Sequence, residues 1–534
     1  MQKSGCYNPL DHQGKGRACR PGIWTRNLSA EGFRTLIANS TKSFVHLSVN
    51  QEQSSDIEDP GIKNLSTCLK TFKALKGLSI SLICSKLTDS DILPLLHSLQ
   101  NLKKLTKLSL SFKMVKISDE VLMTLASILP GLKHLETLAI NLDSLEVSNG
   151  AIRSLSSSFK RLKYLQELDV KINYCPNITH LGMTAIFRAI GSLENLNSLI
   201  VGFRLSQISD SSISLFSNSL SKLKQLRALR MNLASTKISD QGIIQLSSSL
   251  KQLQCLKVLE CGFEGSPNIG DQGINQLSLS LNSLHTLENL IIGIGSKSKI
   301  TDSSLQNLAK SLQELESLKT LAIRLNSSRI SDPGIQAFSS TLKSLDSLRA
   351  LAIDCSNCQQ ITSVGFSALV SSIKYLANLS TLVAHFNNCR KMDENVVVLL
   401  ASSLQALQSL KKLTISLPAL LSDKTVGSLS LHLQDLSYLK SLKLCFGESA
   451  MLGGLSLAAL SSSIKNLQLL ETLEIKFNKC VNLSGSDLAA ISPIRNVKSL
   501  TKLTVDFSSC WEINDSAKYH LRDVFKSIAE CHVL

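Results

Sequence analysis

The 534-residue sequence has few aromatic side chains and no long apolar segment. Phe, Trp and Tyr make up 4% of the residues, whereas hydrophobic residues make up 43%. Leu, Ile and Val must therefore supply most of the interior. Because no stretch of about 18 or more uncharged apolar residues occurs, we expect no membrane-spanning helix. The polar start MQKSGCYNPLDHQGKGRACRPG lacks the apolar centre of a secretory signal.

The cysteines also indicate where the protein is located. The sequence contains 14 of them, and without an export signal we expect reduced thiols rather than a disulfide framework. We therefore expect an intracellular protein, placed in the cytoplasm with the nucleus left open. Residues 1–26 are expected to form a disordered tail.

Recognisable catalytic and cofactor motifs are also missing. No Ser or Cys lies in a known nucleophile motif, and Gly14-Lys15-Gly16 lacks the spacing and preceding strand of a phosphate-binding loop. Cys355 and Cys358 have zinc-like spacing, and Cys389 would add a third ligand. A structural zinc site needs four ligands, so buried thiols are the favoured interpretation. We expect no cofactor, no metal and no enzymatic activity.

The sequence is rich in copies of one phrase. KISDQGIIQLSSSLKQLQCLKVLECGF at 237–263 is followed by NIGDQGINQLSLSLNSLHTLENLIIGI at 268–294 and RISDPGIQAFSSTLKSLDSLRALAIDC at 329–355. A leucine opens a short alternating segment in each of sixteen such repeats, at intervals of 29 to 31 residues. These anchor leucines are Leu47, Leu78, Leu108, Leu138, Leu168, Leu199, Leu229, Leu259, Leu290, Leu321, Leu351, Leu382, Leu413, Leu442, Leu473 and Leu503.

Each repeat combines the signals of a strand and a helix. Apolar residues alternate after the anchor leucine, which predicts a half-buried strand. Ten to twelve residues after the anchor comes a column rich in Asp, and the apolar spacing that follows it is helical. We interpret the Asp residues as helix N-caps that accept hydrogen bonds from their own helix. Each stands alone in its repeat, whereas calcium needs six or more oxygen ligands.

A strand, a turn and a helix repeated at constant period predict a solenoid with parallel strands. The phrase Ile238-Ser239-Asp240-Gln241-Gly242-Ile243, with Leu246, resembles leucine-rich repeat proteins of the ribonuclease inhibitor-like class. Cys175-Pro176-Asn177-Ile178-Thr179 resembles the cysteine-containing repeats of many F-box substrate receptors.

The resemblance implies an α/β leucine-rich repeat solenoid, a horseshoe with a concave parallel sheet, convex helices and about 16 repeats. We place it at 27–520, beginning with a partial N-terminal capping unit, and expect a C-terminal capping helix at 521–534. The resemblance also implies protein binding along the concave sheet, and no chemistry.

The net charge of +16 raises the question of an anionic partner. The solvent side of the predicted strands carries seven cationic and seven anionic residues. The predicted concave face is therefore neutral, which disfavours a nucleic-acid groove there. Cations recur two residues before the anchor leucine and predict a basic rim. They are Lys76, Arg227, Lys257, Lys319, Arg349, Lys411 and Lys440. A solvated edge is the favoured interpretation, and an acidic partner is the alternative.

One stretch of the predicted concave face is unusual. Its first row is apolar and its second mostly polar, and both cross four consecutive strands. The rows contain Ile291, Ala322, Ala352 and Val383, followed by Gly293, Arg324, Asp354 and His385. Exposed apolar residues beside polar anchors predict a partner-binding surface, which we call the docking patch. An unused strand face is the simpler alternative.

These observations predict a non-enzymatic, monomeric scaffold that binds a protein partner on its concave face. The partner's identity does not follow from the sequence. Two alternatives stay open. One is a substrate-recognition subunit of a ubiquitin ligase, and the other is binding of nucleic acid or an acidic surface through the basic rim. Nucleic acid is the less expected of these possible binding partners.

Overall fold

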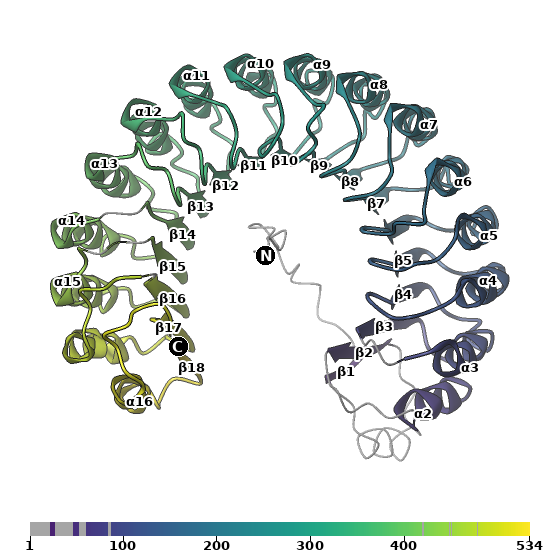
Figure 1. The fold of residues 1–534 in the computed structure, drawn as a ribbon, viewed down its shortest axis with the longest axis horizontal. Coiled ribbons are helices and arrows are strands. Elements are labelled where there is room, and N and C mark those ends of the chain that lie inside the picture. Colours follow the sequence, from purple (N-terminus) through teal and green to yellow (C-terminus); the bar gives the residue numbers. More distant parts are fainter. Residues whose placement is uncertain are drawn as a thin grey trace. The chain divides into compact units, whose positions relative to one another are not determined.

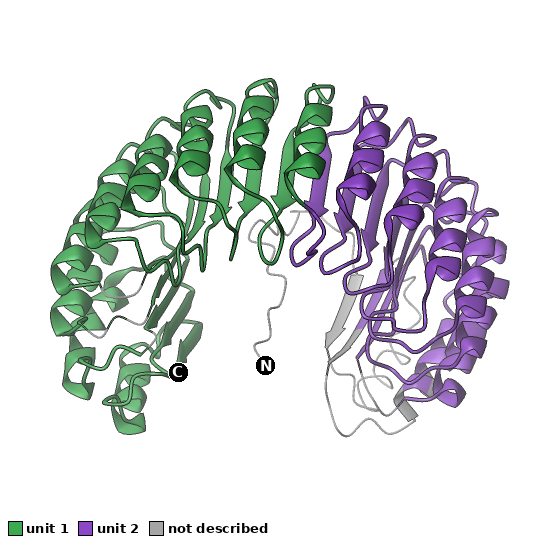
Figure 2. Ribbon diagram, turned by 45° about the horizontal axis from the view of Figure 1, so that its top comes forward, with its two compact units in different colours: residues 1–11, 270–534 green, residues 12–269 purple. Residues whose placement is uncertain are grey.

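A computed structural model describes residues 22–26, 46–52, 60–83, 87–418, 421–447, 449, 451–477 and 479–534. The chain divides into two compact units. Unit 2 comprises residues 12–269, and unit 1 comprises residues 1–11 and 270–534 (Figure 2). Most of the expected N-terminal tail, and the segment of the partial capping unit before residue 46, lie outside the described residues.

Unit 2 alternates strands and helices along the chain. Its strands pair in parallel, each with the next in sequence. The elements are β1 Gly22–Arg26, β2 His46–Glu52, α2 Pro60–Leu69, β3 Gly77–Ile83, α3 Asp89–Leu99, β4 Lys107–Ser111, α4 Asp119–Ile128, η1 Leu129–Gly131, β5 Thr137–Asn141, α5 Asn149–Phe159, β6 Glu167–Lys171, α6 His180–Ile190, β7 Ser198–Gly202, α7 Asp210–Leu220, β8 Ala228–Asn232, α8 Asp240–Leu250 and β9 Val258–Gly262.

Unit 1 continues the same pattern with parallel pairing between consecutive strands. Its elements are α9 Asp271–Leu281, β10 Asn289–Gly293, α10 Asp302–Gln313, β11 Thr320–Arg324, α11 Asp332–Leu342, β12 Ala350–Asp354, α12 Ser363–Ile373, β13 Thr381–His385, α13 Glu394–Leu404, β14 Lys412–Ser416, α14 Asp423–Leu433, β15 Ser441–Phe446, α15 Gly454–Ile464, β16 Thr472–Phe477, η2 Gly485–Asn496, β17 Lys502–Asp506, α16 Asp515–Val524 and β18 Glu530–Val533.

In each unit the helices cover one face of the sheet and leave the opposite face, here called the open face, without helices (Figure 1). The anchor leucines point to the helices. They pair in register, as Leu290 does with Leu321 and Leu321 with Leu351, and these three are 0% exposed. The prediction of an α/β solenoid with about 16 repeats is therefore confirmed.

The two ends of the array differ from the expectation. Residues 22–26, expected in the disordered tail, form β1 and pair with β2. The segment 521–534, expected as a capping helix, is helical only to Val524 and then forms β18, which pairs with β17. Both extra strands cover a sheet edge that would otherwise leave backbone groups unpaired. Val533 is fully buried at this edge.

The Asp column does not cap its own helices, which corrects the sequence interpretation. In α8 the N-cap is Ser239, whose hydroxyl accepts from the Gln241 N–H, and Asp240 is the first helical residue. The preceding repeat's Asp210 reaches forward instead. Its carboxylate accepts from the Ser239 N–H at 2.8 Å and from the Ser239 hydroxyl at 2.5 Å. Asp302 and Ser331 repeat this arrangement in unit 1.

The glycine of the recurring phrase leaves space for the same carboxylate. A Cβ on Gly242 would lie 2.5 Å from Oδ1 of Asp210, a distance that carbon and oxygen atoms do not tolerate. Glycine thus makes room for the preceding repeat's carboxylate. Where Ser304 takes this position, its hydroxyl donates to Asp271 at 2.5 Å. The Ser-Asp-x-Gly phrase therefore encodes a hydrogen-bonded ladder between successive helix starts.

Candidate functional site

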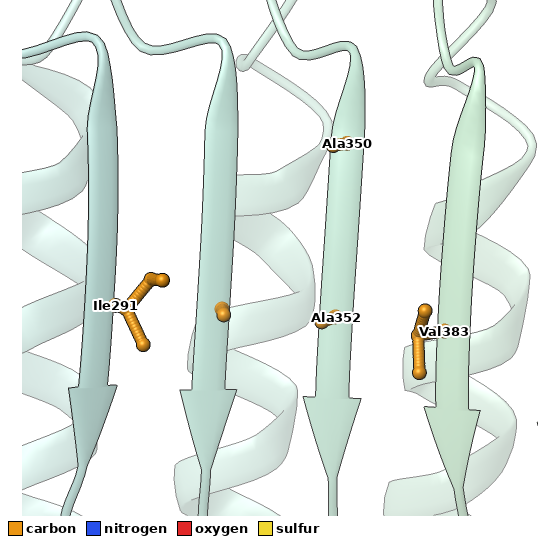
Figure 3. Close-up of a cluster of buried hydrophobic side chains, with 5 residues drawn as sticks. Ile291, Ala350, Ala352 and Val383 are labelled. Carbon is orange, nitrogen blue, oxygen red and sulfur yellow. The ribbon is translucent and has the colours of Figure 1, made fainter. Parts of the chain in front are cut away.

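The register of β10 to β13 brings the eight docking-patch residues together in unit 1. Adjacent strands align Ile291 with Ala322, Ala322 with Ala352, and Ala352 with Val383. The second row runs in the same way from Gly293 through Arg324 and Asp354 to His385. Ile291, Ala352 and Val383 lie on the open face, opposite the helices (Figure 3). The two rows are therefore one continuous surface feature.

The apolar row is less accessible than the sequence suggests. Ile291, Ala322, Ala352 and Val383 are 7%, 1%, 3% and 1% exposed, so the expectation of exposed apolar side chains is wrong. These side chains form one buried cluster with Ala350. Ala139 and Ile200, in the same column of unit 2, are half-buried, so the strand spacing alone does not bury this column. The apolar row is the floor of the patch rather than its contact surface.

The polar row remains within reach of solvent. Arg324, Asp354 and His385 are half-buried. The imidazole Nδ1 of His385 lies 2.8 Å from the hydroxyl oxygen of Ser416, its register partner on β14. One carboxylate oxygen of Asp354 accepts from the Ser356 N–H at 2.9 Å. Ser416 was missed in the sequence, although it occupies the same offset from its anchor leucine as His385 does.

The electrostatic surroundings of His385 favour the neutral imidazole. Burial lowers its pKa, Asp354 opposes this shift, and the Lys443 ammonium adds to it. A neutral imidazole can donate one hydrogen bond and accept another. The polar row therefore offers a cation, an anion and a neutral polar ring on three adjacent strands.

Charges elsewhere on the open face are paired across the strands, as equal offsets predict. Arg230 lies 3.8 Å from Glu260 in unit 2. In unit 1, Lys443 lies 2.9 Å from Glu474, and Lys476 lies 4.0 Å from Asp506. Such partly exposed pairs contribute little to stability. They do make these parts of the face nearly neutral, which is unfavourable for a polyanion.

The basic rim is also partly neutralised. Lys319 forms an ion pair with Glu288 at 2.8 Å, and Lys440 pairs with Glu471 at 2.6 Å. Both acids occupy the same column as the cations, one repeat away. The sequence interpretation considered only the cationic members of this column. The rim of unit 1 is thus a mixed row rather than an unbroken basic stripe.

The cysteine thiols satisfy backbone carbonyls of the preceding repeat. Cys358 donates to the Leu325 carbonyl at 3.2 Å, and Cys389 donates to the Cys355 carbonyl at 3.0 Å. Burial raises the pKa of Cys389 to about 12, so its thiol stays protonated and able to donate. Across the described residues no group of three or more His, Cys, Asp or Glu side chains could hold a metal ion.

The fold defines the class of protein, an α/β solenoid of strand–helix repeats. No family model matches the sequence, and no curated protein matches it. Among solved structures, the chain is similar to one in the crystal structure of the Rad7 and Elc1 complex in yeast, with 22% identity and a TM-score of 0.42. The match covers 68% of this chain and 83% of that one. This likeness is too distant to define a family or a function. No helix in the described ranges is long and apolar enough to cross a membrane.

Proposed function

We propose that the protein is a non-enzymatic scaffold that binds a protein partner at the docking patch of unit 1. The main supporting observation is the register that places Arg324, Asp354 and His385 side by side above a close-packed apolar floor. Backbone pairing holds these three positions before a partner arrives, so little conformational entropy is lost on binding. Fixed polar groups of different charge favour the binding of one specific partner over nonspecific association.

The partner would extend beyond the eight residues. A stable interface buries about 800 Å² on each protein, more than three half-buried side chains provide. The neighbouring strands β14 to β16 continue the face with Ser416, Lys443 and Glu474, and the last two are already paired with each other. Contacts there would fit the rim of an interface, where paired charges add specificity more than affinity.

The test compares proteins that cross-link to tagged wild type and to Arg324→Ala/His385→Ala. Arg230→Ala, which removes a cation from the open face of unit 2, is the matched control. A partner recognised by the patch should be captured by wild type and by the control, and lost with the double variant. With purified components its affinity should fall about tenfold or more, because truncated central contacts cost about 2 kcal/mol. An unchanged captured set and unchanged affinity would contradict the proposal.

The two alternatives gain no specific support. In the Cys-Pro-Asn phrase, Cys175 donates to the Leu142 carbonyl and Asn177 to the Glu146 carbonyl, so packing between repeats accounts for both side chains. Co-purification with ligase subunits is the experiment that tests the ubiquitin-ligase prediction. Nucleic-acid binding predicts strongly salt-dependent affinity, and the ion pairs along the rim of unit 1 disfavour such binding there.

A further inference from the structure

A groove runs along one edge of unit 2, whereas the docking patch belongs to unit 1. It consists of two adjoining hollows of about 280 and 530 Å³ that share Tyr164 and Gln166. The lining side chains come from the loops that lead from each helix into the next strand, at two and four residues before the anchor leucines. They are Lys76, Lys104, Thr106, His134, Glu136, Tyr164, Gln166, Asn195, Asn197, Gln225 and Arg227. We call this the edge groove.

Apart from Glu136, the middle of the edge groove is neutral and rich in hydrogen-bonding groups. Gln166, Asn197 and Gln225 carry carboxamides, each with both donor and acceptor atoms. Tyr164 is 64% exposed, so its ring and hydroxyl are open to a ligand. The Asn197 amide bonds weakly to Gln166 at 3.4 Å, which leaves most of the donors and acceptors of these two groups available. The backbone of an extended peptide presents the complementary alternation of N–H and C=O groups.

The ends of the edge groove are cationic. Lys76 and Lys104 lie at one end and Arg227 at the other. Within the part of the chain that the structure describes, none of these three side chains forms an ion pair, in contrast to Lys319 and Lys440 on the rim of unit 1. Glu136 supplies the single carboxylate, between the two ends. This distribution attracts anionic groups at the ends and repels them near Glu136.

The length of the edge groove limits the ligand. Lys76 immediately precedes β3 and Arg227 immediately precedes β8. The intervening strands pair in sequence, so the two residues are five strand spacings apart. At about 4.8 Å per spacing this is about 24 Å, the length of about seven residues of extended chain.

We propose that the edge groove binds an extended polypeptide segment of about seven residues with carboxylates near both ends and a neutral middle. The end carboxylates meet Lys76, Lys104 and Arg227. The central backbone meets the carboxamides and Tyr164. The proposal concerns a surface separate from the docking patch, and either can fail without the other.

The experiment selects peptides from a random octapeptide library displayed on phage, using the full-length protein as bait. Selected peptides are then synthesised, and their affinities are measured by fluorescence anisotropy. Lys104→Glu/Arg227→Glu reverses one cation at each end of the groove. Lys133→Glu/Lys163→Glu makes the same change in net charge in neighbouring loops, at exposed residues that do not line the groove. Circular dichroism checks the folding of both variants.

We expect selected peptides with acidic residues near both ends. Their binding should weaken about tenfold or more in Lys104→Glu/Arg227→Glu and change less than about twofold in the control. Tyr164→Ala/Gln166→Ala, which keeps the charge, should also weaken binding, and this result decides the question if the charge reversal unfolds the protein.

Three results would overturn the proposal. The selection yields no peptide or yields peptides without acidic ends. Both charge variants lose affinity equally, which indicates attraction to net charge alone. Or the neutral sugar cellohexaose binds the groove while no peptide does, which assigns the carboxamides to a carbohydrate.

Discussion

The ladder between helix starts leads to a quantitative prediction for Asp332. Its carboxylate accepts from the Thr362 N–H at 2.8 Å, the Thr362 hydroxyl at 2.6 Å and the Gly365 N–H at 3.1 Å. Asp332→Ala removes the acceptor for all three donors. Hydrogen bonds to a charged group contribute about 1.5–3 kcal/mol each, but Thr362, which supplies two of the donors, is half-buried and its groups can recruit water. We therefore expect the free energy of unfolding to fall by about 3 kcal/mol.

The chain itself supplies the control. At the start of α5, Asn149 occupies the Asp position, and its Oδ1 accepts from the Thr179 and Gly182 N–H groups, both at 3.0 Å. Its amide donates to the Thr179 hydroxyl, also at 3.0 Å. Asp332→Asn should therefore keep the geometry and lose less than about 1 kcal/mol. Urea denaturation followed by circular dichroism measures both variants. An Asn variant as unstable as the Ala variant, or an Ala variant within 0.5 kcal/mol of wild type, would refute the ladder as a source of stability.

Four further predictions test individual contacts. Gly242→Ala should destabilise the protein in urea denaturation, because its Cβ would lie 2.4 Å from Cγ2 of Ile238 and 2.5 Å from Oδ1 of Asp210, and combination with Asp210→Ala should remove the part of the loss that is due to Asp210. Phe477→Ala, which removes a fully buried ring stacked between two others, should cost about 4 kcal/mol in urea denaturation. Burial raises the pKa of Asp169, so Asp169→Asn should raise the melting temperature at pH 7.5, by an amount that disappears as the carboxyl becomes protonated at low pH. Burial lowers the pKa of His385 from 6.5, so wild-type stability should fall as pH drops below about 6.5, and His385→Gln should lose this part of the pH dependence.

The repeat could be predicted from the sequence because its signals are local and recur in every copy. Anchor leucines at a constant period fix which strand residues face the helices, and equal offsets predict register neighbours such as Lys443 and Glu474. The role of the Asp column could not be predicted in this way. Its partners lie one repeat later, and a cap within the same helix is equally compatible with a single copy of the phrase.

The sequence predicted the register of the eight docking-patch residues but not the burial of the apolar row. Sequence offsets identify which side chains share a face, and the structure brings all eight together. Exposure does not follow from the offset, because Ala322 and Ala352 are buried whereas Ala139, at the same offset in unit 2, is half-buried. The terminal strands were missed for a related reason. Single strands such as β18 do not repeat, so no periodic signal distinguishes them from a helix end.

The ladder between helix starts also gives the array a direction. Among the described repeats, carboxylates such as Asp210 and Asp302 accept from the repeat that follows. Asp515, the column residue of α16, instead has a fully exposed side chain whose carboxylate lies 3.9 Å from Nζ of Lys518 in its own helix. Insertion or deletion of a whole repeat, with its Ser-Asp-x-Gly phrase intact, keeps these hydrogen bonds in register. A junction inside the phrase would break the two hydrogen bonds between the carboxylate and the serine of the next repeat. Junctions outside the phrase are therefore the favourable sites for lengthening or shortening this protein.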